Sequence, residues 1–242
     1  MDTLLYYTIQ AGFVLLSILY VGLLIRELRK GIALTNWAPS RRKRFTATIF
    51  VTIILWAAFV SIWSLSGKMS DFSIFPLNLM PVILIPLLGL VIILNSRGFT
   101  EVLAHVPPAN IIRLQTFRFF VEVLLWMLFI ENLLPVQMTF EGRNFDILAG
   151  FSAPIIAVLV SKGNISRTAV VIWNFVCLGL LLNIVITAIL STPSPWRVFM
   201  NEPANYIVTY FPISWLPGIL VPLAYYLHFF SLKALPHPKS LS

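Results

Sequence analysis

Long apolar segments, separated by short polar stretches, dominate the chain from one end to the other. Seven of them are long enough to cross the hydrocarbon core of a bilayer as helices, which takes about 20 residues each. We place them near Leu4–Ile25, Thr46–Leu65, Leu77–Leu94, Ile111–Leu134, Asp146–Val160, Thr168–Leu190 and Pro212–Leu232. This pattern predicts an all-α integral membrane protein with seven transmembrane helices.

The composition supports the same class of protein. Of the 242 residues, 59% are apolar and 11% are charged, whereas soluble domains average about 45–50% apolar and about 25% charged residues. We therefore expect residues 1–242 to form a single transmembrane helical domain. A net charge of +8 would suggest nucleic acid binding in a soluble protein. Here the basic residues lie between apolar segments, so we expect the lipid bilayer as partner and no nucleic acid.

The basic residues are divided unevenly between the two sides of the predicted bundle. One set of loops contains Lys68, Arg143 and Arg197, and the other set, with its helix ends, contains the remaining fourteen, Lys233 and Lys239 among them. Short loops rich in Lys and Arg stay in the cytoplasm. The sequence therefore predicts an N-terminus outside and a C-terminus inside. A bacterial inner membrane is the default location for such a protein.

Proline recurs with the same spacing in the third and the seventh segments. In each, a Phe–Pro pair is followed by two more prolines at intervals of five residues. The prolines are Pro76, Pro81 and Pro86 in one segment and Pro212, Pro217 and Pro222 in the other. Each proline removes a backbone donor and bends a helix. In a membrane, the polar groups that this frees must be buried in protein or face a cavity.

The first and the fifth segments also correspond, since both contain the sequence Ala-Gly-Phe, at residues 11–13 and 149–151. Together these matches predict two parallel three-helix repeats, residues 1–95 and 146–235, linked by a helix over residues 111–134. Parallel repeats of this kind are a known transporter design. The alternative is coincidence, because proline is common in membrane helices.

Proline-interrupted helices at corresponding positions of two repeats indicate a central binding site. We therefore expect a small-solute carrier whose substrate site includes Asn78, Pro81, Ser214, Trp215 and Pro217. Two alternatives remain open at this point. One is a membrane-embedded enzyme acting on a lipid-linked substrate, which requires a lateral opening near Glu122 or His228. The other is an accessory or sensory subunit of a membrane complex.

Charged residues inside the fourth segment form a second candidate site. Arg118 and Glu122 are four residues apart, so they lie on one face of a helix and can neutralise each other. Charges within a membrane usually face protein or a cavity and often serve function, although a structural pair at the inner interface is the alternative. In the outer loop, Glu141, Arg143 and Asp146 favour a surface salt bridge and a helix cap at Asp146, with a binding lip as the alternative.

The remaining chemistry is sparse. The chain has three histidines and one cysteine, without the spacing of a zinc site, and it lacks a Walker loop or a Gly-x-Ser-x-Gly elbow. We therefore expect no metal, no cofactor and no identifiable catalytic residue, which favours a protein that is not an enzyme. His228, beside Tyr225 and Tyr226, is interpreted as an anchor at the membrane interface.

Overall fold

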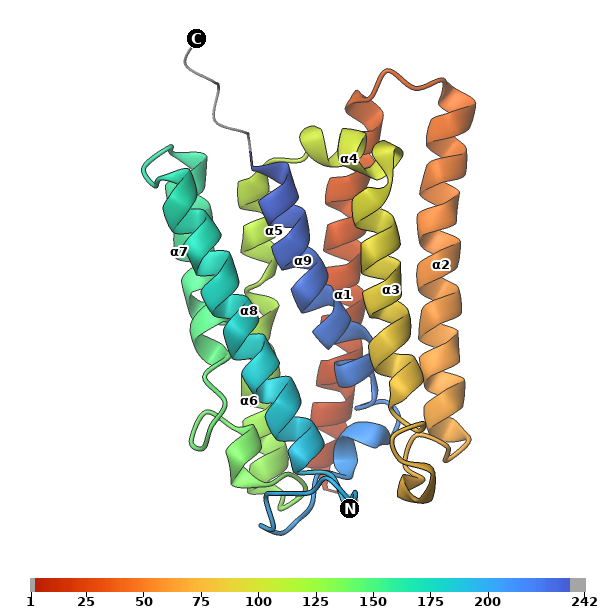
Figure 1. Ribbon diagram of the computed structural model, residues 1–242, viewed down its shortest axis with the longest axis vertical. Coiled ribbons are helices and arrows are strands. Elements are labelled where there is room, and N and C mark those ends of the chain that lie inside the picture. Colours follow the sequence, from red (N-terminus) through yellow and green to blue (C-terminus); the bar gives the residue numbers. More distant parts are fainter. Residues whose placement is uncertain (1–2, 236–242) are drawn as a thin grey trace.

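The computed structural model describes residues 3–235 as an elongated bundle of helices (Figure 1). The chain passes repeatedly from one end of the bundle to the other, so that α1 begins at one end and α9 ends at the opposite end. The α-helices are α1 (Leu4–Leu34), α2 (Pro39–Leu65), α3 (Met80–Asn95), α4 (Arg97–Ala104), α5 (Pro108–Leu114), α6 (Phe117–Ile130), α7 (Ile147–Ser161), α8 (Arg167–Leu190) and α9 (Val221–Ala234). Shorter elements are the 3₁₀-helices η1 (Phe72–Ile74), η2 (Val136–Met138) and η3 (Ile207–Thr209) and the π-helical turn η4 (Leu216–Leu220).

The starts of several helices follow from local sequence. The side chains of Thr3, Ser96 and Ser166 each accept a hydrogen bond from a backbone N–H three residues ahead, at 3.0, 3.3 and 3.1 Å. Such caps satisfy donors that a helix leaves unpaired at its beginning. Pro39 and Pro108 begin α2 and α5, at a position where the missing N–H costs nothing.

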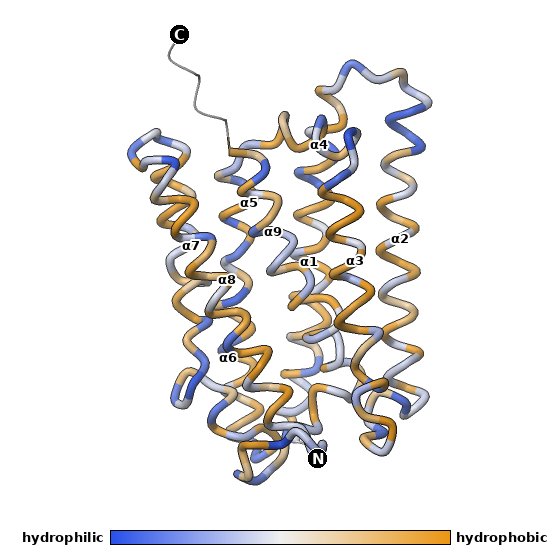
Figure 2. Tube along the Cα trace, viewed as in Figure 1, coloured by the Kyte–Doolittle hydropathy of each residue, from blue (hydrophilic) through white to orange (hydrophobic). Residues whose placement is uncertain are grey.

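Among residues 3–235, three helices, α1, α2 and α8, are long and apolar enough to cross a membrane. Helices α3 and α4 together meet the same condition, but the chain bends by 75° between them. Helix α7 is apolar and has 15 residues. Hydrophilic residues gather at the two ends of the bundle, whereas hydrophobic ones dominate its middle (Figure 2). The protein is thus all-helical, as the sequence predicts, and its helices are compatible with a helical membrane protein.

Two predicted segments are interrupted. The expected continuous helix over 111–134 is divided into α5 and α6, and it ends at Ile130. The seventh segment, expected from Pro212, begins with turns and continues through η4 into α9. Pro217 and Pro222 cannot donate the backbone hydrogen bonds that a regular helix needs at these positions. The π-helical turn η4, a rare type of helix, precedes α9 here.

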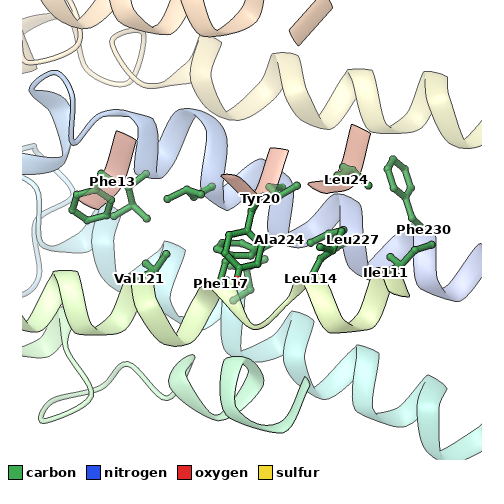
Figure 3. Packing of buried hydrophobic residues seen from close by; sticks show 14 of the residues in the cluster. Phe13, Tyr20, Leu24, Ile111, Leu114, Phe117, Val121, Ala224, Leu227 and Phe230 are labelled. Carbon is green, nitrogen blue, oxygen red and sulfur yellow. The ribbon is translucent and has the colours of Figure 1, made fainter. Parts of the chain in front are cut away.

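The largest apolar core lies between α1, the α5–α6 pair and α9 (Figure 3). Phe13 and Tyr20 on α1 pack toward Phe117 and Val121 on α6, and Leu227 reaches the same cluster from α9. The rings of Tyr20 and Phe117 lie 5.5 Å apart, centre to centre. This packing encloses α6, which carries the charged residues of the candidate site.

Small residues bring α7 against α5 and α6. Ala149, Ala153 and Ala157 are fully buried. A side-chain carbon built on Gly150 would lie 2.2 Å from the backbone nitrogen of Phe119 on α6. Small residues allow helix backbones to approach closely in membrane proteins. Helix α6 therefore packs against both α1 and α7.

Candidate functional site

The break between α5 and α6 sets the position of Arg118. The backbone N–H groups of Gln115 and Thr116 bond to carbonyls three residues earlier, at 3.0 and 3.2 Å, which tightens the turn. The side-chain amide of Gln115 donates to the carbonyl of Ala224 on α9 at 2.9 Å. Helix α6 then begins at Phe117. Arg118 consequently lies in the first turn of α6, close to α7, α8 and α9.

Arg118 is 1% exposed and binds groups from three other parts of the chain. Its Nε donates to Oδ2 of Asp146 at 2.7 Å, and its Nη2 forms an ion pair with Oδ1 of the same carboxylate. Nη2 also donates to the carbonyl of Cys177 at 3.0 Å, and Nη1 lies 2.8 Å from Nε2 of His228. A guanidinium matches a carboxylate through two parallel bonds. Arg118 thus joins α6 to the start of α7 and to α8 and α9.

The partners of His228 define its protonation. A guanidinium can only donate, so Nε2 of His228 accepts the bond from Arg118. The hydrogen is then on Nδ1, which lies 2.9 Å from Oδ1 of Asn174, and Ser231 donates to the same oxygen at 2.7 Å. Asn174 donates in turn to the carbonyl of Val170 at 2.9 Å. His228 is therefore a neutral positioning residue whose lone pair is already occupied.

Glu122 lies next to this network but has a different partner. The side chain of Asn144 donates to Oε2 of Glu122 at 2.6 Å, and its own oxygen accepts from the backbone N–H of Asp146 at 3.1 Å. Within residues 3–235, the carboxylate of Glu122 has no other hydrogen bond and no ion pair within 4.0 Å. The expected pairing of Arg118 with Glu122 is thus wrong. The two carboxylate oxygens of Asp146 bind Nε and Nη2 of Arg118 instead.

A cavity of about 530 Å³ lies beside this cluster, bounded by α3, α6, α8, η4 and α9. Arg118, Glu122 and Asp146 are its charged lining residues, and most of the others are leucine, isoleucine, valine or aromatic residues. This volume falls within the range of ligand pockets, roughly 300–1,000 Å³. An apolar wall with a few polar groups is also the usual composition of such pockets.

The cavity opens on the apolar flank of the bundle. Leu87 on α3 and Leu182 on α8 both line it, and they are 40% and 59% exposed. Their neighbours Leu88 and Ile186 are likewise exposed and apolar. The opening of the cavity therefore lies between α3 and α8.

Two lining residues have polar atoms without a partner. The side-chain oxygen of Asn205 and the hydroxyl of Tyr225 are buried, and neither has a hydrogen bond to any residue that the structure describes. Buried polar atoms are almost always hydrogen-bonded. The cavity therefore has unused hydrogen-bonding capacity that a bound molecule can take up.

Of the five predicted substrate residues, Pro217 lines the cavity. The others lie near it and make contacts elsewhere. Asn78 is buried, donates to the carbonyl of Met69 at 3.1 Å, and accepts at its backbone carbonyl from Trp63 on α2. Trp215 donates to Ser61 on α2 at 2.9 Å. Ser214 is fully buried, with a hydroxyl that has no partner among the described residues, and Pro81 is half-buried near the start of α3.

The loop over residues 137–146 differs from its predicted arrangement. Asp146 stands at the N-cap position of α7, but its side chain does not cap the helix, because both oxygens bind Arg118. Glu141 accepts from the indole of Trp126 at 2.7 Å, and the guanidinium of Arg143 lies over the ring of Phe199 at 5.3 Å. Within the described chain, neither Glu141 nor Arg143 forms the expected salt bridge.

Sequence reasoning missed part of the polar network. The interpretation of His228 as an interfacial anchor is wrong, because its side chain is fully buried. Asn144 and Asn174 were not predicted as site residues at all. A signal existed in the sequence: Asn174 interrupts an apolar run, and His228 and Ser231 lie three residues apart on one helix face. Polar side chains in such places need a partner inside the protein.

In the part of the chain that the structure describes, no three His, Cys, Asp or Glu side chains are grouped so as to hold a metal ion. A family model described as a domain of unknown function (DUF8737) matches residues 74–236, a stretch that contains Arg118, Glu122, Asp146 and every residue lining the cavity except Met69. No curated protein and no solved structure is significantly similar to the chain.

Proposed function

Since the chain belongs to the family described as a domain of unknown function (DUF8737), and that description assigns no activity, we propose one from the geometry. The protein is a membrane carrier that binds an amphipathic solute in the cavity beside Arg118 and Glu122. The observation that carries this proposal is a cavity of ligand size that opens between exposed apolar residues of α3 and α8 and ends at a buried charged cluster. An apolar tail fits its walls, and a polar group fits its charged end.

The topology proposed for this carrier has seven spans, with the N-terminus outside and the C-terminus in the cytoplasm of a bacterial cell. Its support is the repeated passage of the chain along the bundle (Figure 1) and the concentration of Lys and Arg in one set of loops. Lys233, at the end of α9, belongs to the inner set. Lys239, which the sequence prediction assigns to the same set, lies outside the described residues.

Local similarities support the two-repeat arrangement as part of the proposal. A 3₁₀-helix and a turn precede both α3 and η4, and the prolines then fall at corresponding places, Pro81 with Pro217 and Pro86 with Pro222. Gly12 on α1 and Gly150 on α7, which match in sequence, both approach α6 closely. Helix α6 is thus the linker between two similarly oriented triplets, as parallel-repeat transporters require.

An enzyme acting on a lipid-linked substrate would use the same opening, because Glu122 is a carboxylate in the cavity wall. Acid–base catalysis needs groups that are free to reach the substrate. Asp146 and His228 are each bonded to Arg118 instead. We therefore favour the carrier, and a bound molecule that is recovered chemically unchanged supports it over the enzyme.

Filling the cavity tests the proposal. Val185 on α8 lines the cavity, whereas its neighbour Ile186 does not line it and is 46% exposed. We expect Val185→Trp to weaken the binding of dansyl-labelled dodecanol at least roughly tenfold, because the indole occupies the space of the alkyl chain. Ile186→Trp should leave the affinity unchanged. Dansyl fluorescence with the full chain in phosphatidylcholine nanodiscs measures both affinities.

Transport is measured with the same pair of variants. Proteoliposomes containing the wild-type chain or Ile186→Trp should accumulate a radiolabelled amphiphile faster than protein-free vesicles, and Val185→Trp should not. Equal binding and equal uptake by the two variants would contradict a role for this cavity. Thermal unfolding of each variant in the same nanodiscs establishes that the comparison is between folded proteins.

A further inference from the structure

The charges that line the cavity do not balance. The described residues of its wall include one guanidinium, Arg118, and two carboxylates, Glu122 and Asp146. Arg118 is engaged by both oxygens of Asp146. His228, which also binds Arg118, is neutral because its Nε2 accepts that bond. Among the described residues, Glu122 therefore has no ion pair within 4.0 Å, because Arg118 binds Asp146.

An unpaired charge in the middle of a membrane protein is unfavourable, because neither lipid nor apolar side chains solvate it. Glu122 is 1% exposed, and the described residues give its side chain one hydrogen bond, from Asn144. One such bond does not replace a hydration shell or a counter-charge. A cation beside Glu122 would supply that counter-charge, whereas without one a proton on the carboxyl removes the charge.

The rest of the wall fits the same ligand. Phe117, Tyr225 and Phe229 line the cavity together with Glu122. The faces of aromatic rings attract cations, most strongly where water is excluded. The leucines at the mouth, Leu87 and Leu182, offer an apolar surface to an alkyl chain. Carboxylate, aromatic rings and apolar walls are together the features that recognise a lipophilic ammonium ion.

We propose that the ligand of the cavity is an amphipathic cation, with its ammonium group beside Glu122 and its alkyl chain directed toward the opening between α3 and α8. This inference rests on the proposed function and adds the charge of the substrate. Asp146 remains paired with Arg118 in the complex, and Glu122 supplies the charge that the ligand neutralises. Anionic amphiphiles are excluded by the same excess of negative charge.

Competition between chain-matched amphiphiles tests the charge. Dansyl-labelled dodecanol bound to the full chain in nanodiscs is displaced with dodecyltrimethylammonium, with dodecanol or with dodecanoate. We expect the cation to displace the label at a concentration at least roughly tenfold lower than dodecanol does, and dodecanoate to be the weakest competitor. Glu122→Gln keeps the size of the side chain and its bond to Asn144. In this variant, the cation and dodecanol should displace the label at nearly equal concentrations.

Two further variants keep the test decisive. Glu122→Asp retains a carboxylate and should retain the preference for the cation. Glu131→Gln removes a carboxylate that does not line the cavity and binds Thr3 at the outer end, and it should change nothing. If Glu122→Gln does not fold, the inference is judged from the wild-type ratio together with Glu122→Asp.

The two proposals fail in different ways. If the cation and the alcohol compete equally with the wild-type chain while Val185→Trp abolishes both, the cavity binds amphiphiles and the cation inference is overturned. If Val185→Trp has no effect on any of the probes, the proposed function itself is overturned. A preference for the cation that survives in Glu122→Gln also overturns the inference, because the charge is then recognised elsewhere.

Discussion

Replacing Arg118 by Gln is expected to lower the free energy of unfolding by about 3–5 kcal/mol, the usual effect of removing one partner of a buried ion pair. The substitution leaves Asp146 as an unpaired carboxylate that is 5% exposed. It also removes the donors to His228 and to the carbonyl of Cys177. Unfolding of the purified protein in mixed micelles with increasing SDS measures the loss.

Arg113 provides the matched control for this prediction. It lies five residues earlier, is exposed at the end of α5, and should tolerate Gln with a change below about 0.5 kcal/mol. The double variant Arg118→Gln with Asp146→Asn should recover at least half of the lost stability, because it removes the orphaned charge and keeps groups that hydrogen-bond. Equal stability of the two single variants, Arg118→Gln and Arg113→Gln, would show that the pair is not buried.

Gly150→Ala is expected to have the second largest effect. The added carbon would lie 2.2 Å from the backbone nitrogen of Phe119, and a backbone cannot rotate away as a side chain can. Overpacking costs about 1–3 kcal/mol in ordinary cores, and occasionally more. We expect a loss at the upper end of this range, together with a displacement of Asp146 that weakens binding at the cavity. SDS unfolding and dansyl fluorescence measure the two effects.

Other helical glycines give a graded control. Alanine at Gly12 would meet the side chain of Leu124 at 2.7 Å, which can change its rotamer, so the loss should be smaller than at Gly150. Nothing lies within 4 Å of a carbon built at Gly179. There alanine should be neutral or slightly stabilising, because it favours a helix over glycine. A Gly150→Ala protein as stable as Gly179→Ala would contradict the close approach of α7 to α6.

The extent to which the fold is predictable from sequence depends on the range of the interactions involved. Apolar segments and their caps are local properties, so α8, expected over 168–190, covers Arg167–Leu190. Helices α1 and α2 extend past the apolar segments into polar sequence, to Leu34 and back to Pro39, where the predicted bounds were Ile25 and Thr46. The interruption at Gln115 was not predicted. Its side chain bonds to Ala224, 109 residues later, and a local pattern contains no information about that contact.

The sequence by itself determined an all-helical chain with long apolar helices, and it identified Arg118 and Glu122 as charges within an apolar segment. Both conclusions depend on hydrophobicity and charge, which are properties of the individual residues. Only the tertiary structure decided which carboxylate forms the ion pair with Arg118. A spacing of four residues allows Arg118 to meet Glu122, but a guanidinium binds best to a carboxylate that it can contact along its whole edge. Packing of α7 against α6 brings Asp146 into that position. The same packing leaves Glu122 in the wall of a cavity that no sequence pattern outlines.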